Sequence, residues 1–157
     1  MIRPMTKSDK PAVMAIIEAT GFFRPAEILV AEELIDVYLG RPDQKDYRVE
    51  VYEGNGGELA GYLTWGPTPL TEGTYDLYWM AVCPEHQRKG LGKDLVAWLE
   101  RRVADLGGRM ILVETSSQPR YEPTRRFYLG LNYAEIARIP DFYQPGDDRV
   151  IYVKHLA

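Results

Sequence analysis

The sequence predicts a mixed α/β fold in which one sheet carries helices on both faces. In short segments such as Tyr47–Glu53, apolar residues alternate with polar ones, which is typical of strands. In longer segments they recur every three to four residues, which is typical of amphipathic helices. Near the middle of the chain a strand, a helix and a second strand follow one another. That order predicts a right-handed parallel crossover, while the hairpins on either side predict antiparallel pairs.

The first part of the chain reads as a short edge strand and two helices. Ile2–Pro4 is the candidate strand, and Ser8 or Asp9 caps a helix that ends at Gly21. A second helix is predicted over Glu27–Leu39. Its inward residues are predicted to be Leu34, Val37 and Tyr38.

A hairpin and a further strand follow. Tyr47–Glu53 is joined by the turn Gly54–Gly57 to a returning strand over Leu59–Trp65. The next strand is predicted from about Thr74 to Val82. These strands account for the antiparallel part of the expected sheet.

The second half alternates helices and strands. Arg109–Glu114 is nearly continuously apolar, which predicts a strand buried on both faces. A short helix contains Phe127 and Tyr128, and Tyr133–Ile139 and Arg149–Val153 are the last two strands. The long helix before them ends at Gly107–Gly108, and its apolar face is predicted to hold Leu91, Leu95, Leu99, Val103 and Leu106.

The composition predicts a single domain over residues 1–157 in an ordinary cytoplasmic protein. A net charge of −4 argues against nucleic-acid binding and is compatible with a cationic partner such as an amine. One cysteine and two histidines give no metal-site spacing, so no metal is expected, and Cys83 is interpreted as a small packed thiol. No apolar run is long enough to serve as a signal peptide or to span a membrane.

The most informative segment is the loop Gln87–Gly92, which joins an apolar strand to a long helix. Gly90 and Gly92 allow a tight turn and a close backbone approach to a ligand. The first turn of a helix offers unpaired N–H groups and the positive end of the helix dipole. This combination predicts a phosphate or pyrophosphate site.

Two known glycine motifs do not fit this loop. The nucleoside-triphosphate motif requires Ser or Thr after its Gly-Lys pair, and Asp94 stands there. The dinucleotide fingerprint requires a third glycine, and Leu95 occupies that position.

From Asp76 to Tyr133 the chain resembles the GNAT superfamily of acyl-CoA-dependent N-acetyltransferases. Gln87–Gly92 matches the family's Gln/Arg-x-x-Gly-x-Gly/Ala motif. Arg126–Tyr133 is similar to its Phe-Tyr signature, although Asn132 takes the usual glycine place. The resemblance implies a GNAT-like fold, with a mostly antiparallel central sheet, one parallel strand pair that splays, and helices on both faces.

The resemblance also implies a binding site for acetyl-CoA as co-substrate. In the family the pantetheine arm pairs with the strand before the loop, and the pyrophosphate lies on the loop. Thr124 falls where many relatives carry an asparagine that contacts the cofactor. The implied contacts are Met80, Ala81, Val82, Gln87, Arg88, Lys89, Gly90, Leu91, Gly92, Lys93, Thr124 and Tyr128.

Catalytic roles follow from the same resemblance. Tyr128 matches the tyrosine that protonates the leaving sulfur. An alkylammonium, with a pKa near ~10, must lose a proton before it attacks. Asp76 and Glu114 match carboxylates that act as base in different branches of the family, and ordered water is a third alternative.

The implied activity is acetyl transfer from acetyl-CoA to a primary amine by direct attack in a ternary complex. The acceptor is a small amine, an amino acid or a peptide N-terminus. It would meet the segments Gly21–Arg24 and Asp141–Asp148 and the acidic residues Glu32, Glu33 and Asp36. A non-catalytic acyl-CoA sensor and a transferase of larger acyl groups are the alternatives. A homodimer is left open, and no nucleic-acid or membrane partner is expected.

Overall fold

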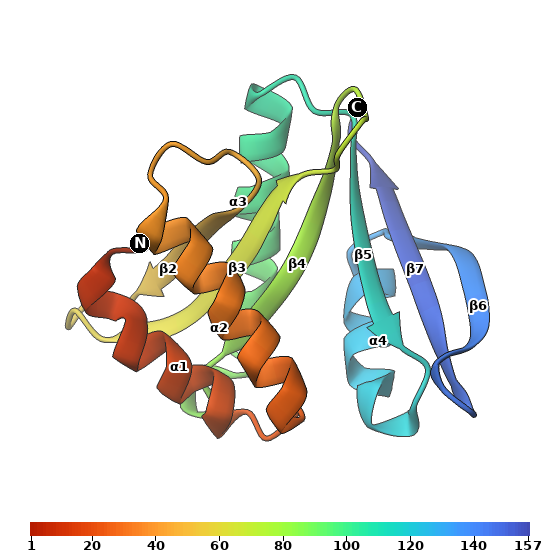
Figure 1. The fold of residues 1–157 in the computed structure, drawn as a ribbon, viewed down its shortest axis with the longest axis horizontal. Helices are drawn as coiled ribbons and strands as arrows, with labels where there is room; N and C mark the ends of the chain where they lie inside the picture. Colours follow the sequence, from red (N-terminus) through yellow and green to blue (C-terminus); the bar gives the residue numbers. More distant parts are fainter.

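A computed structural model describes residues 1–157. Its strands are β1 (Ile2–Pro4), β2 (Arg48–Glu53), β3 (Leu59–Pro67), β4 (Thr74–Val82), β5 (Met110–Ser116), β6 (Ala134–Gln144) and β7 (Asp147–His155). They form one sheet in the order β1-β2-β3-β4-β5-β7-β6 (Figure 1). All neighbours are antiparallel except β4 and β5, which are parallel. The predicted fold class is therefore confirmed.

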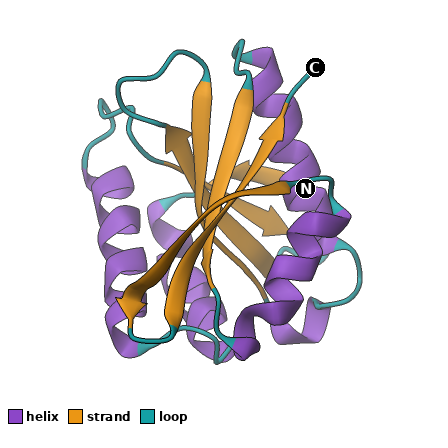
Figure 2. Ribbon diagram, turned by 90° about the vertical axis from the view of Figure 1, so that its right-hand side faces the viewer, coloured by secondary structure: helices purple, strands orange, loops and turns teal.

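The helices lie on both sides of this sheet (Figure 2). The α-helices are α1 (Lys10–Ala19), α2 (Pro25–Gly40), α3 (Leu91–Asp105) and α4 (Glu122–Gly130). Three short 3-10 turns, η1 (Lys7–Asp9), η2 (Pro84–His86) and η3 (Pro119–Tyr121), precede α1, α3 and α4. None of the helices has the length and hydrophobicity that crossing a lipid bilayer requires.

Two hydrophobic cores occupy opposite faces of the sheet. On one face α1 and α2 pack on β2, β3 and β4, with Val49, Val51 and Tyr62 fully buried. On the other face α3 and α4 pack on β3 to β7, with Trp65 and Leu99 fully buried. Because successive strand residues point to opposite faces, each strand in the middle of the sheet contributes to both cores.

Two helix faces differ from the prediction. On α2 the fully buried residues are Ala31 and Ile35, whereas Leu34 and Val37 are only half-buried. Apolar residues surround most of α2, so periodicity alone does not select its inward face. Leu106 is 39% exposed rather than buried, because α3 ends at Asp105.

The prediction that the strand after α3 is buried on both faces is wrong. Ile111, Val113 and Thr115 of β5 are buried against α3 and α4. On the opposite face Leu112 is half-buried and Glu114 is exposed. The physical reason is that α1 and α2 cover β2 to β4 only and stop short of β5 (Figure 1). This uncovered face of the sheet is where the candidate site lies.

One buried carboxylate gives the fold a pH-dependent stability. Glu50 on β2 lies on the α3 face of the sheet, is 6% exposed, and its Oε2 has no hydrogen-bond partner. Burial raises the pKa of Glu50 from 4.5 to about 7, although the nearby Arg48 and Arg102 charges oppose the shift. The native state therefore keeps a proton that the unfolded chain releases between these pH values.

We expect the free energy of unfolding to fall by roughly 3 kcal/mol as pH rises from 4.5 to 7, at about 1.4 kcal/mol per pKa unit. In Glu50→Gln this loss should disappear, because the amide does not titrate. Urea unfolding at pH 5 and pH 8 measures the effect. Glu58→Gln, at an exposed turn residue, is the matched control. Equal pH slopes in wild type and Glu50→Gln would contradict the assignment.

Candidate active site

The parallel strands β4 and β5 separate partway along their length. Backbone pairing joins Thr74–Leu77 to Met110–Val113 and stops there, although both strands continue. The cause is a bulge: Trp79 pairs with Thr64 and Leu77 with Trp65, so Tyr78 is an extra residue on β4. A bulge bends its strand. The two strands diverge beyond it, toward the bottom of Figure 1.

The loop after β4 leads into α3 with its backbone donors free. Gly90 is the N-cap of α3 and adopts a left-handed conformation, with φ of 88°. No side chain caps the helix, and the N–H groups of Leu91, Gly92 and Lys93 have no acceptor in the protein. Free N–H groups at the positive end of a 15-residue helix are suited to an anion.

The loop itself is held to β4 by one side chain. Gln87 donates a hydrogen bond from Nε2 to the carbonyl oxygen of Val82 at 3.1 Å. The Gln87 side chain therefore fixes the loop rather than facing a ligand. Arg88 and Lys89 are exposed, and Arg88 has a φ of 63°, which is unusual for a residue with a side chain and is found often at functional sites.

The two sequence motifs meet at Gly92. A Cβ atom at Gly92 would lie 3.4 Å from the ring of Phe127, so the missing side chain lets α4 approach the start of α3 closely. Tyr128 is the next residue on α4 and is 5% exposed. Thr124 lies one turn earlier on the helix and is half-buried. Tyr128 is thus brought beside the loop by packing.

Tyr128 sits in a cluster of aromatic rings. Its ring centroid lies 5.2 Å from that of Phe127, 5.6 Å from Tyr133 and 6.4 Å from Tyr152. Burial raises the pKa of Tyr128 above its usual value, so the phenol keeps its proton at neutral pH.

The uncovered face of the sheet has a small cavity at the point where β4 and β5 separate. Its volume is about 30 Å³, which is room for one or two water molecules. Both predicted carboxylates, Asp76 and Glu114, line it. The remaining lining residues are Leu77, Tyr78, Leu112, Val113, Arg149 and Ile151.

Asp76 is the carboxylate without an ion pair. Its Oδ2 accepts a hydrogen bond from Thr68 Oγ1 at 2.6 Å. Tyr78 lies beside it, and burial together with the Asp76 charge raises the pKa of Tyr78 to about 12. The loop before β2 packs closely against β3 here, since a Cβ added at Gly66 would lie 1.9 Å from the Asp46 carbonyl oxygen. The next loop residue, Tyr47, has its ring centroid 5.6 Å from that of Tyr78.

Glu114 is already engaged by two side chains. Arg149 Nε lies 2.5 Å from Glu114 Oε2, and the Tyr143 hydroxyl donates to the same oxygen at 3.1 Å. The Arg149 guanidinium also lies 5.1 Å from the centre of the Phe142 ring. This cluster ties the β6–β7 hairpin to β5.

Sequence reasoning missed several residues of this site and misplaced others. Tyr78 and Arg149 carry no sequence signal, because the bulge and the last strand's register decide where they point. Glu32 and Asp36 do not line the cavity, since both pair with Lys10 between α1 and α2, at 2.9 and 2.7 Å.

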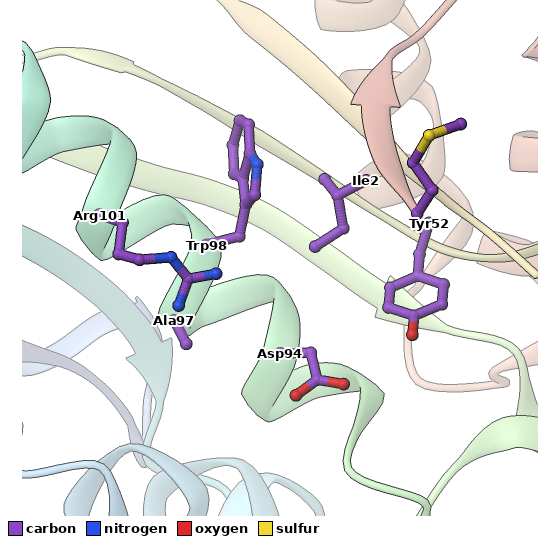
Figure 3. Close-up of a pocket in the computed structure, with 7 residues that line it drawn as sticks. Ile2, Tyr52, Asp94, Ala97, Trp98 and Arg101 are labelled. Atoms are coloured by element: carbon purple, nitrogen blue, oxygen red, sulfur yellow. The ribbon is translucent and has the colours of Figure 1, made fainter.

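A second cavity lies elsewhere, between β1, β2 and α3 (Figure 3). Its walls include Tyr52, Trp98 and Arg101. It contains none of the residues that the sequence predicts for the site. No cluster of three or more His, Cys, Asp or Glu side chains is arranged to hold a metal ion.

The sequence profile of the acetyltransferase (GNAT) family matches residues 16–133. The chain belongs to this family. Among solved structures, one described as an acetyltransferase of the GNAT family from Desulfovibrio desulfuricans is 42% identical, with a TM-score of 0.94. The alignment covers 100% of this chain and 99% of that one. No curated protein sequence matches this chain significantly.

More distant structures share the fold of this acetyltransferase. An aminoglycoside 6'-N-acetyltransferase complexed with coenzyme A has a TM-score of 0.76 at 18% identity, covering 100% of this chain and 97% of that one. A ribosomal-protein alanine N-acetyltransferase from Escherichia coli has a TM-score of 0.77 at 19% identity, covering 100% and 94%. At these identities the likeness concerns the fold alone.

Gly92→Val should weaken coenzyme A binding to this acetyltransferase by about 10-fold or more, because overpacking against Phe127 costs roughly 1–3 kcal/mol and displaces the start of α3. Titration calorimetry with coenzyme A measures the affinity, and a thermal melt measures folding. Gly40→Val is the matched control, since a Cβ at Gly40 meets nothing within 4 Å. An unchanged affinity in the folded Gly92→Val variant would contradict this role for Gly92.

Proposed function

We propose that this protein is an acetyl-CoA-dependent N-acetyltransferase that acts by direct transfer to a primary amine in a ternary complex. One observation carries the proposal: the sheet separates at Tyr78, with a free N–H loop beyond the separation and a carboxylate-lined cavity on the uncovered face. A donor entering along the loop and an acceptor entering from the cavity would meet where β4 and β5 part.

The residues present fit coenzyme A. Met80, Ala81 and Val82 belong to the part of β4 that no longer pairs with β5, so their strand edge is open to the amide groups of the pantetheine arm. The N–H groups of Leu91, Gly92 and Lys93 would bind the pyrophosphate. Arg88, Lys89 and Lys93 add positive charge around it, and Thr124 lies on the helix that carries Tyr128.

Acetyl transfer requires two proton movements. The ammonium gives one proton to a base, and the neutral nitrogen then attacks the thioester carbon. The nitrogen loses its second proton as the carbon–sulfur bond breaks, and the departing sulfur takes one. We assign the donor to the sulfur to Tyr128. Its raised pKa makes it a weak acid but a reliable hydrogen-bond donor to a developing thiolate.

Asp76 is the better candidate for the base. It has no ion pair, and it lies in the cavity beside Tyr78. Glu114 is bound by Arg149 and Tyr143, so taking up a proton there would weaken an ion pair. The cavity has room for one or two waters, which would let Asp76 act through water as well as directly.

Tyr128→Phe should lower kcat by about 10²–10³-fold and leave coenzyme A affinity within about twofold, because only the departing sulfur loses its donor. Thiol release from acetyl-CoA with a panel of amines measures turnover. Tyr133→Phe is the matched control, as this neighbouring buried hydroxyl donates to Glu100 instead. Unchanged turnover in Tyr128→Phe would remove Tyr128 from the mechanism. Coenzyme A binding without turnover in wild type would indicate the sensor alternative.

Asp76→Asn should lower kcat/KM at pH 7 by about 10²-fold, and part of the loss should be recovered as pH rises toward the amine pKa of ~10. At high pH more of the amine is already neutral and needs no base. Glu114→Gln should lower kcat by less than about 10-fold over the same pH range. The opposite ranking of the two variants would assign the base to Glu114.

A further inference from the structure

The cavity at the strand separation is lined by charged groups of both signs. Asp76 forms no ion pair, and its carboxylate accepts a hydrogen bond from the neutral Thr68 hydroxyl. Arg149 faces the same cavity from β7. The two side chains do not pair with each other, so each is open to a group of the ligand.

The Arg149 guanidinium is positioned by Glu114 and by the Phe142 ring. Its Nε lies against Glu114, and its planar group lies over the Phe142 ring. The shortest contact of this ion pair is made by Nε and not by the two terminal nitrogens, and the side chain is 31% exposed. A guanidinium fixed in this way presents two parallel donors, an arrangement that matches a carboxylate.

Aromatic rings lie against residues of the cavity on two sides, and we call these four rings the rim. Tyr47 and Tyr78 pack together on the β4 side. Phe142 and Tyr143 pack together on the hairpin side, and they are 48% and 38% exposed. The cavity has a volume of about 30 Å³ and admits only small polar groups. A side chain of the ligand would therefore lie outside the cavity, against this rim.

We propose that the acceptor is an α-amino acid whose ammonium group binds Asp76 and whose carboxylate binds the terminal nitrogens of Arg149. This inference rests on the proposed N-acetyltransferase function. Its chemistry is that of the transfer above: the α-nitrogen forms an amide bond with the acetyl carbon, the carbon–sulfur bond breaks, and one proton is released to solvent overall. An amine or a peptide N-terminus has no α-carboxylate and would leave the terminal nitrogens of Arg149 without a partner.

The test compares each amino acid with its own carboxamide, which keeps the amine and the side chain but removes the negative charge. Acetyl-CoA is incubated with the twenty amino acids, their amides, simple alkylamines and short peptides, and the acetylated products are quantified by mass spectrometry. At least one amino acid should be acetylated with a kcat/KM about 10- to 100-fold above that of its amide.

Arg149→Gln should remove that preference. For the amino acid, KM should rise about 10- to 100-fold with little change in kcat, and for the amide both parameters should change less than about threefold. Arg149→Lys keeps the positive charge but loses the two parallel donors, so its KM for the amino acid should lie between those of wild type and Arg149→Gln. Arg138→Gln is the matched control, because Arg138 is an ion-paired arginine of the same hairpin that does not line the cavity.

The failures of this inference and of the proposed function are distinguishable. If amides, amines or peptides are acetylated as well as amino acids, or if Arg149→Gln slows every acceptor equally, the amino-acid inference is wrong while the transferase function stands. In the latter case Arg149 only supports the hairpin. If no acceptor of any class is acetylated, both are wrong, and coenzyme A calorimetry then reports whether the donor site exists.

Discussion

The extra residue on β4 is the constraint on which the rest of the site depends. A parallel strand pair buried in a sheet normally keeps its backbone hydrogen bonds along its whole length, because unpaired buried amides are costly. Here the bulge at Tyr78 turns β4 away after Leu77, and from there on the two strands no longer pair with each other. The facing edges of the two strands are thereby left without hydrogen bonds to each other beyond Leu77 and Val113.

Helix coverage then gives the two faces different roles. On one side α3 and α4 close over the separation, and they bring the free N–H groups and the buried Tyr128 close together. On the other side α1 and α2 stop at β4 and leave β5 and β7 uncovered. The loop between α1 and α2 reaches across the gap, where the Tyr121 hydroxyl donates to the Phe22 carbonyl at 3.2 Å. In the proposed function, the donor and acceptor sides are separated by the sheet and meet only where β4 and β5 part.

Burial and pairing divide the ionisable groups of the site into distinct chemical roles. Tyr128 and Tyr78 hold their protons because burial raises their pKa values. Glu114 is neutralised by Arg149, whereas Asp76 keeps its carboxylate free of cations. Two carboxylates at one cavity therefore differ in their surroundings: Glu114 pairs with a guanidinium, whereas Asp76 accepts a hydrogen bond from a neutral hydroxyl.

The sequence alone determined the fold class, the bounds of β4, the glycine loop before α3 and the Phe127–Tyr128 pair, because these features are local. Periodicity, glycine conformation and helix termini are properties of short segments. Only the tertiary structure decided the bulge at Tyr78, the inward face of α2, the exposure of Glu114 and its pairing with Arg149. These depend on strand register and on which helix covers which strand, and such contacts join residues far apart in the chain. The glycine loop before α3 could therefore be predicted from the sequence, whereas the arrangement of side chains around the cavity could not.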